Sequence, residues 1–441
     1  MQQSRTVHGV SASENAESRH LPLVDLLIDT RTELTELVVR SGLKVLEAML
    51  EEDRTAVCGP RYAHQDDRAA GRAGTTASTV VLGGRKVEIR RPRVRAGQQE
   101  VPLPTFATME QTDPLNRRIV EQMLLGVATR RYARSLEPLP ATIRTRGTSK
   151  SSVSRRFVAR TTAQVRAWQT ASLEVLDLVA IFLDGVIFAE HCLVVALGVD
   201  TTGQKHPLGL WDGSTENAAV CQGLLANLQS RGLRTDRSVL VILDGSKAIR
   251  SAVTHTFGQA ACVQRCQVHK TRNVFEYLPD RQRPWVHAIL RRAYTSADPT
   301  KAQRLLTDLA RRLDDDFPSA AESVREGLDE TLTVLRLPLS DRLRRSLATT
   351  NPIESLMSRT RHVHRNVKRW RHGKMMIRWM TAAVFEAAKG FRRLKGCKDL
   401  PALVAALRRR DEQLGLARPI IDERVALRGI VQVDRQGDRR S

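Results

Sequence analysis

Aromatic residues are scarce in this sequence. Phe, Trp and Tyr together make up 4% of its 441 residues. Proteins that bind single-stranded nucleic acid usually stack the bases on aromatic side chains. The shortage therefore argues against a single-stranded RNA partner and, among nucleic acids, favours duplex DNA.

Cysteines and long apolar runs are also lacking. The six cysteines are scattered and do not form the framework of a disulfide-rich protein. No stretch reaches the roughly 20 apolar residues that span a bilayer. Residues 1–18 lack the apolar segment of a signal peptide. We expect a cytoplasmic, reduced protein with no membrane partner.

Acidic residues are outnumbered by basic ones. Lys and Arg number 71 against 48 Asp and Glu, which gives a formal net charge of +23. A polyanionic partner, most commonly nucleic acid, is the simplest reason for this excess, and a merely basic surface is the alternative. Hydrophobic residues make up 41% of the chain, enough for real cores, and the length predicts about three domains.

The N-terminal part is predicted to contain helix and hairpin. Residues 23–52 carry apolar side chains at helical spacing, which predicts one long amphipathic helix or two helices that break at Ser41–Gly42. Residues 53–78 are interpreted as a loop. Residues 79–89 predict a β-hairpin around the turn Gly83–Gly84.

A second helical region follows, over residues 115–168. The stretch from Ser149 to Phe157 predicts a helix whose start is crowded with small hydroxyl and basic residues. In the second helix of a helix-turn-helix, such residues reach base edges and phosphates. An ordinary N-capped basic helix explains the same pattern equally well. The candidate DNA contacts are Lys150, Ser151, Ser154, Arg155 and Arg156.

Beyond residue 176 the pattern changes to buried strands. The apolar runs 178–188, 192–199 and 206–211 have short links and predict an antiparallel meander. A helix over 216–232 and a further buried strand over 238–243 follow.

The C-terminal half is predicted to be helical. Residues 281–347 show no strand pattern, and residues 359–395 read as one long basic helical region. Residues 401–410 predict one more helix, and the polar remainder to Ser441 is interpreted as a tail.

Two carboxylates stand where apolar strands run. Asp184 lies inside a strand, where a charge is costly unless it is paired, protonated or bound to a metal. Asp244 ends a second strand. Two strands that each deliver a carboxylate to one side of a sheet can build a site for a hard cation such as Mg²⁺. For Asp244 the alternative is a turn, because Asp-Gly commonly follows a strand.

Glu354 has a local explanation of its own. In Asn351-Pro352-Ile-Glu354, Asn351 can cap a helix, Pro352 suits the first helical position, and Glu354 falls at the third. This pattern is a capping box, which by itself requires no metal.

Three segments together resemble a known family. They are Leu-Asp184-Gly-Val, Leu-Asp244-Gly-Ser-Lys-Ala and Asn351-Pro-Ile-Glu354-Ser. In this order they resemble the Mutator-like transposases of bacterial insertion sequences, which are RNase H-fold enzymes with a DDE triad and a mostly helical insertion before the Glu. The separations are 244 − 184 = 60 and 354 − 244 = 110 residues, and the second holds the predicted helical stretch.

Further segments support the resemblance, which covers roughly residues 25–395. Cys266 and His269 look like the family's Cys-x-x-His accessory motif. Residues 87–95, 149–155, 211–217 and 231–233 also fit. One departure is Cys221, where relatives are expected to have Trp.

The cysteines near His269 could also suggest zinc. Cys262, Cys266 and His269 supply three ligands, but a structural zinc site needs four at tighter spacing. A role in packing or toward the substrate is favoured instead. His269 either contacts the strand being cleaved or orients a neighbouring side chain.

The resemblance implies an α/β fold with an RNase H-like mixed-sheet catalytic domain and a helical insertion, preceded by a helical DNA-binding region. The expected segments are an N-terminal helical and hairpin region (1–109), a helix-turn-helix-like DNA-binding region (110–172), the first part of the catalytic core (173–280), the insertion (281–345), the second part of the core with a basic helix (346–400), and a C-terminal helix and tail (401–441).

The resemblance also implies a mechanism and partners. Asp184, Asp244 and Glu354 would be the catalytic and metal-binding residues and would hold Mg²⁺ or Mn²⁺, two ions per site. Water would first cut the end of the element, and the freed 3′-OH would then attack target DNA. The expected partners are double-stranded DNA, as terminal inverted repeats and target, and a second copy in a homodimer on DNA, at the nucleoid of a bacterial cytoplasm. Residues 23–52 would offer an interface, although core packing explains that helix equally well.

The region after Glu354 is strongly basic and is interpreted as a phosphate-binding surface, with a solvated helix face as the alternative. Trp370 and Trp379 are interpreted as packing residues. A nuclease that does not join ends, a catalytically inactive or domesticated DNA-binding relative, and a structural nucleoid protein remain as alternatives to a transposase. The DNA-binding candidates here are Arg359, Arg361, Arg365, Lys368 and Arg369.

Overall fold

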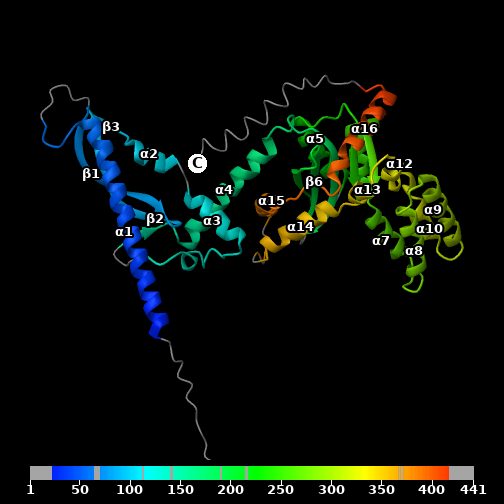
Figure 1. Ribbon diagram of the computed structural model, residues 1–441, viewed down its shortest axis with the longest axis horizontal. Helices are drawn as coiled ribbons and strands as arrows, with labels where there is room; N and C mark the ends of the chain where they lie inside the picture. Colours follow the sequence, from blue (N-terminus) through cyan, green and yellow to red (C-terminus); the bar gives the residue numbers. More distant parts are fainter. Residues whose placement is uncertain are drawn as a thin grey trace, which may run out of the picture. The chain divides into compact units, whose positions relative to one another are not determined.

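The computed structural model describes most of the chain, in two compact units (Figure 1). The first unit comprises residues from 1–119 and 129–153, and the second comprises residues from 120–128 and 154–441. Lys368 and residues 417–441 of the predicted tail lie outside the described residues, whereas residues 411–414, also predicted as tail, are helical. The described ranges are 22–63, 70–111, 114–139, 143–188, 191–213, 217–365, 367, 369–370 and 372–416.

The first unit packs a long helix against a sheet. The strand order is β1-β2-β3, and β4 pairs with β2. Leu46 and Leu50 of helix α1 are buried in one cluster with Ile89 and Val94 of β2. The elements are α1 (Pro22–Cys58), β1 (Gly71–Leu82), β2 (Arg85–Ala96), β3 (Gln99–Val101), α2 (Pro104–Gln111) and β4 (Thr145–Arg146).

This unit confirms the hairpin and corrects the loop. Gly83 and Gly84 both have positive φ and form the predicted turn. Helix α1 is continuous through Ser41–Gly42, so the helix does not break there. The loop predicted for 53–78 is wrong at both ends, because α1 continues to Cys58 and β1 begins at Gly71. The residues of β1 are mostly small and polar, and the strand forms because it pairs with β2 along nearly its whole length.

The second unit contains a five-stranded mixed sheet in the order β7-β6-β5-β8-β9. Strands β5, β6 and β7 are antiparallel neighbours, which confirms the predicted meander. Strand β8 pairs parallel with β5, and β9 pairs parallel with β8. The fold is therefore α/β with a mixed sheet, as predicted. The strands are β5 (Leu178–Phe188), β6 (His191–Asp200), β7 (Lys205–Gly213), β8 (Val239–Leu243) and β9 (Ala261–Arg265).

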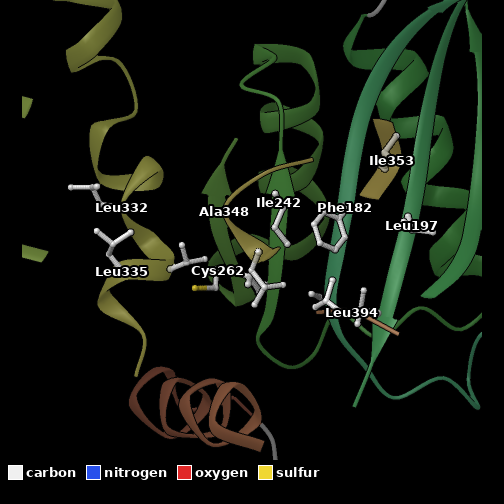
Figure 2. Packing of buried hydrophobic residues seen from close by; sticks show 14 of the residues in the cluster. Phe182, Leu197, Ile242, Cys262, Leu332, Leu335, Ala348, Ile353 and Leu394 are labelled. Atoms are coloured by element: carbon white, nitrogen blue, oxygen red, sulfur yellow. The ribbon is translucent and has the colours of Figure 1, made fainter. Parts of the chain in front are cut away.

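Alternate residues of the strands enter two different cores, as the pleat of a sheet requires. Ile181 and Leu183 face a cluster that includes residues of α5 (Ala218–Ser230) and α6 (Lys247–Phe257). Cys221, the departure from the family pattern, is buried in this cluster. Phe182 and Ile242 face the other cluster, which they share with Ile353 and with residues of the helical segment (Figure 2).

The predicted helical segment is confirmed. Residues 281–347, all of them described, hold six helices and no strand. Another helix, α16 (Leu400–Leu414), matches the one predicted over 401–410. The six helices are α8 (Arg283–Tyr294), α9 (Pro299–Leu313), α10 (Pro318–Arg325), α11 (Leu328–Thr331), α12 (Thr333–Arg336) and α13 (Asp341–Leu347).

The single basic helical region predicted over 359–395 is wrong. Helix α14 (Asn351–Val363) ends, and α15 (Gly373–Ala388) begins after His372, whose ring accepts a hydrogen bond from the Met375 backbone N–H. Helix α15 is a core helix, because Met376, Trp379 and Met380 are buried. Trp379 packs against Phe157 at 4.5 Å between ring centroids, in agreement with a packing role.

The predicted helix-turn-helix is not formed by the two helices in question. Helices α3 (Pro114–Leu124) and α4 (Lys150–Thr170) are separated by residues 125–149, whereas the motif joins its helices by a turn of about 3–4 residues. The Ser149 hydroxyl accepts a hydrogen bond from the Ser152 backbone N–H at 3.3 Å, so α4 begins as an ordinary capped helix. Among the described residues, no helix is long and apolar enough to cross a membrane.

Candidate active site

Asp184 is placed by the strand that contains it. It lies in β5 opposite Val195 of β6, and only 4% of it is exposed. Its even-numbered neighbour Phe182 faces the core that includes α14, so the strand directs Asp184 to the same side of the sheet. A carboxylate this deeply buried requires compensating partners.

Asp244 comes to the same place from the neighbouring strand. Leu183 and Leu243 are register partners in the parallel pair β5–β8, so the residues that follow them stand side by side on strands about 4.8 Å apart. Gly245, with φ +105°, turns the chain immediately afterwards. The Asp244 carboxylate accepts hydrogen bonds from the backbone N–H groups of Ser246, at 2.9 Å, and of Gly185.

The two aspartates raise each other's cost of ionisation. Burial, and next the charge of Asp244, raise the pKa of Asp184 to about 7, while His269 and the Thr350 hydroxyl oppose the shift. Burial also raises the pKa of Asp244, against the hydrogen bond from Ser246 and the charge of His269. Two adjacent carboxyl groups whose pKa values are both raised are characteristic of a functional site.

Glu354 approaches from helix α14. The capping-box interpretation is wrong, because α14 begins after Thr350 and has no side-chain cap. The Glu354 carboxylate is therefore free of its own helix. Its Oε1 lies 3.7 Å from His269 Nε2 and 3.4 Å from Arg272 Nη1. Glu354 thus shares its surroundings with residues of α7 (Gln267–Glu276).

Cys266 and His269 belong to this site. Cys266 is fully buried at the start of α7, and its Sγ lies 3.4 Å from the Thr350 backbone N. Burial raises the pKa of the Cys266 thiol, but hydrogen bonds from His269 and Thr350 more than offset it and hold the pKa below its usual range. The same Cys266 hydrogen bond, with the charges of Asp184 and Asp244, raises the pKa of His269 to about 9. At neutral pH a cationic imidazole therefore lies among the three carboxylates.

Two members of the site escaped the sequence analysis. Thr350 is fully buried, and its hydroxyl lies 3.3 Å from His269 Nδ1. Arg272 follows His269 by three residues on α7, so the two lie on one helix face. That spacing was a usable signal for Arg272. No local pattern marks Thr350, because the partners of its side chain are distant in the sequence.

The carboxylates fit a hard divalent cation in their chemistry. Asp184, which is buried, and Asp244, which is half-buried, are a pair of oxygen donors whose mutual repulsion a divalent cation relieves. Within the described residues, however, no three His, Cys, Asp or Glu side chains are grouped so as to hold one ion together. Two carboxylates are thus brought together, and the third is held beside them by His269 and Arg272. The same finding applies to zinc, since Cys262 is buried in the core away from His269.

Most of the DNA-binding candidates are exposed and lie on α4, on α14 or just after α14. On α4, Arg156 is half-buried and has a partner, and the other four candidates are exposed. On and after α14, Arg359 donates to the Gly390 carbonyl and Arg365 contacts His362. Arg361 follows Glu354 by seven residues, which places it on the same helix face two turns further along. The exposed candidates are Lys150, Ser151, Ser154, Arg155, Arg359, Arg361, Arg365 and Arg369.

Another family-like segment has a structural role. Arg231 is buried, and its guanidinium donates to the carbonyls of Ala171 at 2.8 Å and Leu208 at 2.7 Å. It thereby joins the chain before β5 to strand β7. Residues 231–233 therefore stabilise the domain and do not reach the carboxylates.

Comparison with known proteins gives one consistent result. A family model described as transposase, Mutator family, matches residues 23–393. The transposase for insertion sequence element ISRM5 of Rhizobium meliloti is 27% identical over 342 residues, which are 75% of this chain and 82% of that protein. A probable insertion sequence transposase of Corynebacterium diphtheriae is 30% identical over 53% of this chain and 70% of its own length. The transposase for IS1081 of Mycobacterium tuberculosis is 25% identical over 75% of this chain and 81% of its own length.

Proposed function

The chain belongs to the Mutator family of transposases, and from that premise we propose that it cuts DNA at the ends of an insertion sequence and joins the freed 3′ ends to target DNA. The observation that carries the proposal is the adjacent pair of a buried Asp184 and a half-buried Asp244, on and directly after neighbouring strands, with Glu354 close by. A mixed sheet in which two parallel neighbours each deliver an aspartate supports the RNase H-like class that the family resemblance implies.

Asp184, Asp244 and Glu354 would hold Mg²⁺ or Mn²⁺, two ions per site. Bound divalent cations supply Lewis acidity at the phosphate and lower the pKa of water. The side chains of this chain have the remaining tasks. The burial of Asp184 limits access of bulk water. Arg272 offers a guanidinium to a phosphate beside Glu354, and Arg361 extends the positive charge along the same face of α14.

The proposed partner is duplex DNA in two roles. Exposed residues at the start of α4 are assigned to the terminal inverted repeats, since Ser and Arg there can meet phosphates and base edges. The exposed arginines of α14 are assigned to phosphates, which give affinity without sequence preference.

The second proposed partner is another copy of this chain, bound through helix α1. This helix has two apolar faces, and among the described residues of its unit only one of them is packed. Its outer face consists of Leu34, Leu37, Val38, Val45 and Met49, which are between 43% and 63% exposed.

Two features favour a helical partner for that outer face. Its residues recur at helical spacing from Leu34 to Met49, about 23 Å along the helix axis at about 1.5 Å per residue. A Cβ on Gly42, beside the outer face, would meet nothing within 4 Å, so nothing described in this chain uses the space that the glycine leaves. Two transposon ends must be held together, which makes a second copy the occupant of choice.

One observation favours the alternative, a DNA-binding relative without activity. Glu354 is held by His269 and Arg272 and is not grouped with the two aspartates around a single point. In an inactive relative this arrangement is permanent, whereas in an active enzyme Glu354 must exchange these partners for the site.

The test is cleavage and joining of a labelled end fragment with Mg²⁺, using wild type and Asp184→Asn. We expect wild type to cut and join, and the variant to bind DNA but do neither. Cutting without joining would identify a nuclease. Activity in neither protein, with DNA binding intact, would identify the binding-only relative, and full activity in Asp184→Asn would refute the site.

A further inference from the structure

The side chain of Thr350 does not cap the helix that it precedes. It is the N-cap residue of α14, a position at which a threonine hydroxyl commonly accepts a hydrogen bond from its own helix. Here the hydroxyl makes no such bond, although Thr350 is fully buried. It lies instead 3.6 Å from Cys266 Sγ and 3.3 Å from His269 Nδ1, and it forms a hydrogen bond with the Asp184 carboxylate.

The Thr350 hydroxyl has a single proton to donate and several neighbours that could accept it. A hydroxyl donates once and accepts through its lone pairs. The Thr350 hydroxyl can donate to only one neighbour at a time, either Cys266 Sγ or the Asp184 carboxylate, while its oxygen stays within hydrogen-bond distance of His269 Nδ1. The hydroxyl therefore links the accessory motif to the carboxylate of β5.

Cys266 makes the complementary links through its backbone and thiol. Its backbone N–H donates to the Leu243 carbonyl at 2.7 Å, immediately before Asp244. Its Sγ accepts from the Thr350 backbone N–H at 3.4 Å. A further backbone bond of 3.0 Å, from the Gln267 N–H to the Ala348 carbonyl, joins the same two segments. Cys266 thus connects the chain at Asp244 directly to the start of α14.

The position of Glu354 depends on these links. Glu354 is reached only after the helices α8 to α13, and its own helix is held in the core by apolar contacts of Ile353, Leu356 and Met357. Apolar contacts are not directional, so they do not set the rotation and axial position of a helix closely. Thr350 precedes Glu354 by four residues, about 6 Å along the axis, and the Glu354 backbone N–H donates to the Thr350 carbonyl. A displacement at Thr350 therefore moves Glu354.

We propose that Thr350 and Cys266 form a positioning pair that aligns the Glu354-bearing start of α14 with Asp184 and Asp244. The inference rests on the proposed transposase chemistry and names the residues that set its geometry. Neither residue touches the DNA in this scheme. The accessory Cys-x-x-His segment acts through Thr350: Cys266 anchors the helix start, and His269 contacts both the hydroxyl and Glu354.

The test compares variants that differ by one atom group in the full-length protein. Thr350→Val keeps the shape and removes the hydroxyl, whereas Thr350→Ser keeps the hydroxyl. We expect cleavage by Thr350→Val to fall about 100-fold, the order of loss that follows a small misplacement of a reacting group, and Thr350→Ser to remain within about 5-fold of wild type. Cys266→Ala, which removes the thiol acceptor, is the second variant, with Cys266→Ser as its control.

A second readout does not depend on activity. Hydrogen–deuterium exchange of the peptide spanning residues 350–357, measured without DNA or added metal, reports how firmly the start of α14 is held. We expect faster exchange there in Thr350→Val and Cys266→Ala, unchanged exchange in α16, and wild-type behaviour in Thr350→Ser. Such local loosening without global unfolding separates positioning from general stability.

The outcomes distinguish failure of the positioning pair from failure of the proposed function. Wild-type cleavage and exchange in both Thr350→Val and Cys266→Ala would overturn the positioning pair and leave the transposase proposal intact. Equal loss of activity in Thr350→Ser and Thr350→Val would also overturn it, because the hydroxyl would then not be what matters. If wild type itself does not cut, the proposed function fails, and faster exchange in Thr350→Val would still support the link between Thr350 and α14.

Discussion

Glu354 is the residue that separates an active transposase from a binding-only relative. In the structure it is 37% exposed and paired with His269 and Arg272. Ion pairs this exposed contribute little to folding, generally less than about 1 kcal/mol. Glu354→Gln removes the charge and keeps the shape, so we expect an unchanged melting temperature and at least about a 100-fold loss of Mg²⁺-dependent cleavage.

The matched control for Glu354 is Glu386→Gln. Glu386 lies on the neighbouring helix α15, is 34% exposed and is paired with Lys389. Its substitution removes the same charge from a similar setting away from the aspartates, and cleavage should be retained. Equal cleavage by wild type and Glu354→Gln would show that the third ligand must be sought elsewhere.

His364 is an uncharged histidine in an aromatic setting. It is 3% exposed, and Phe188 and Trp370 pack against it. Neither of its ring nitrogens has a hydrogen-bond partner among the described residues. Burial lowers its pKa from 6.5 to about 4. The folded state therefore disfavours protonation of His364. The free energy of unfolding is not reduced by this residue above pH 6.5, and it falls as the pH drops from 6.5 toward 4.

His364→Phe should remove this pH dependence. Relative to pH 7.5, the histidine should cost the wild type about 2 kcal/mol at pH 5, and the loss approaches about 3 kcal/mol at pH 4. Phenylalanine fits the same aromatic surroundings and leaves no ring nitrogens unpaired, so the variant should also be more stable at neutral pH. Urea unfolding at pH 7.5 and pH 5 measures both effects, and parallel losses in the two proteins would contradict this account of His364.

At the scale of whole elements, helix α1 offers a direct test of the dimer. Replacing Leu34, Val38 and Val45 by glutamine keeps helix propensity and removes most of the apolar outer face. If two copies pair through this face, the dissociation constant should rise at least about 100-fold, since each buried aliphatic side chain contributes on the order of 1.5–3 kcal/mol. Sedimentation equilibrium measures this constant.

Two controls make the α1 result specific. Glu47→Gln changes an exposed polar position of the same helix and should leave the dissociation constant unchanged. Gly42→Ala should stabilise the isolated helix by about 1 kcal/mol and yet weaken the dimer if the glycine serves a close helix crossing. A wild-type protein that stays monomeric at tens of micromolar would refute α1 as the dimer surface.

Some of the helices and strands could be predicted from the sequence, and others could not. Strands β5, β6 and β8 are buried on both faces, so their continuous apolar runs were readable. Strand β1 was not, because its small polar residues form a strand only through pairing with β2. The break between α14 and α15 was hidden because the basic residues continue across it.

In the candidate site, too, residues marked by a local sequence pattern could be predicted, and contacts between distant residues could not. The three acids were predicted from segments that follow one another in the order of a known family. The contacts of Thr350 were not found, because they arise only when residues 266, 269 and 184 meet it in three dimensions. Local propensity cannot reveal a hydroxyl whose partners are all distant in sequence.

For the whole molecule, a net charge of +23 predicts binding to duplex DNA that weakens steeply with salt. Each phosphate contact lowers the slope of log K against log salt by about 0.9, so Arg361→Gln with Arg365→Gln should make the slope shallower by about 2. Both arginines are exposed on or just after α14. Their loss should weaken end fragments and unrelated duplexes alike, because phosphate contacts carry no sequence information.

Residues of α4 should behave differently in the same titration. Ser154→Ala with Arg155→Ala should reduce the preference for end fragments over unrelated duplex, while the slope changes by only about 1 for the single lost charge. Arg409→Gln, an exposed position on α16, serves as the charge control and should alter neither quantity. Fluorescence anisotropy on both duplexes from 50 to 300 mM salt resolves preference from slope. Arg409→Gln could instead make the slope as much shallower as one α14 substitution does. The positive charge would then act as a diffuse field around the protein, and α14 would not be a defined phosphate-binding surface.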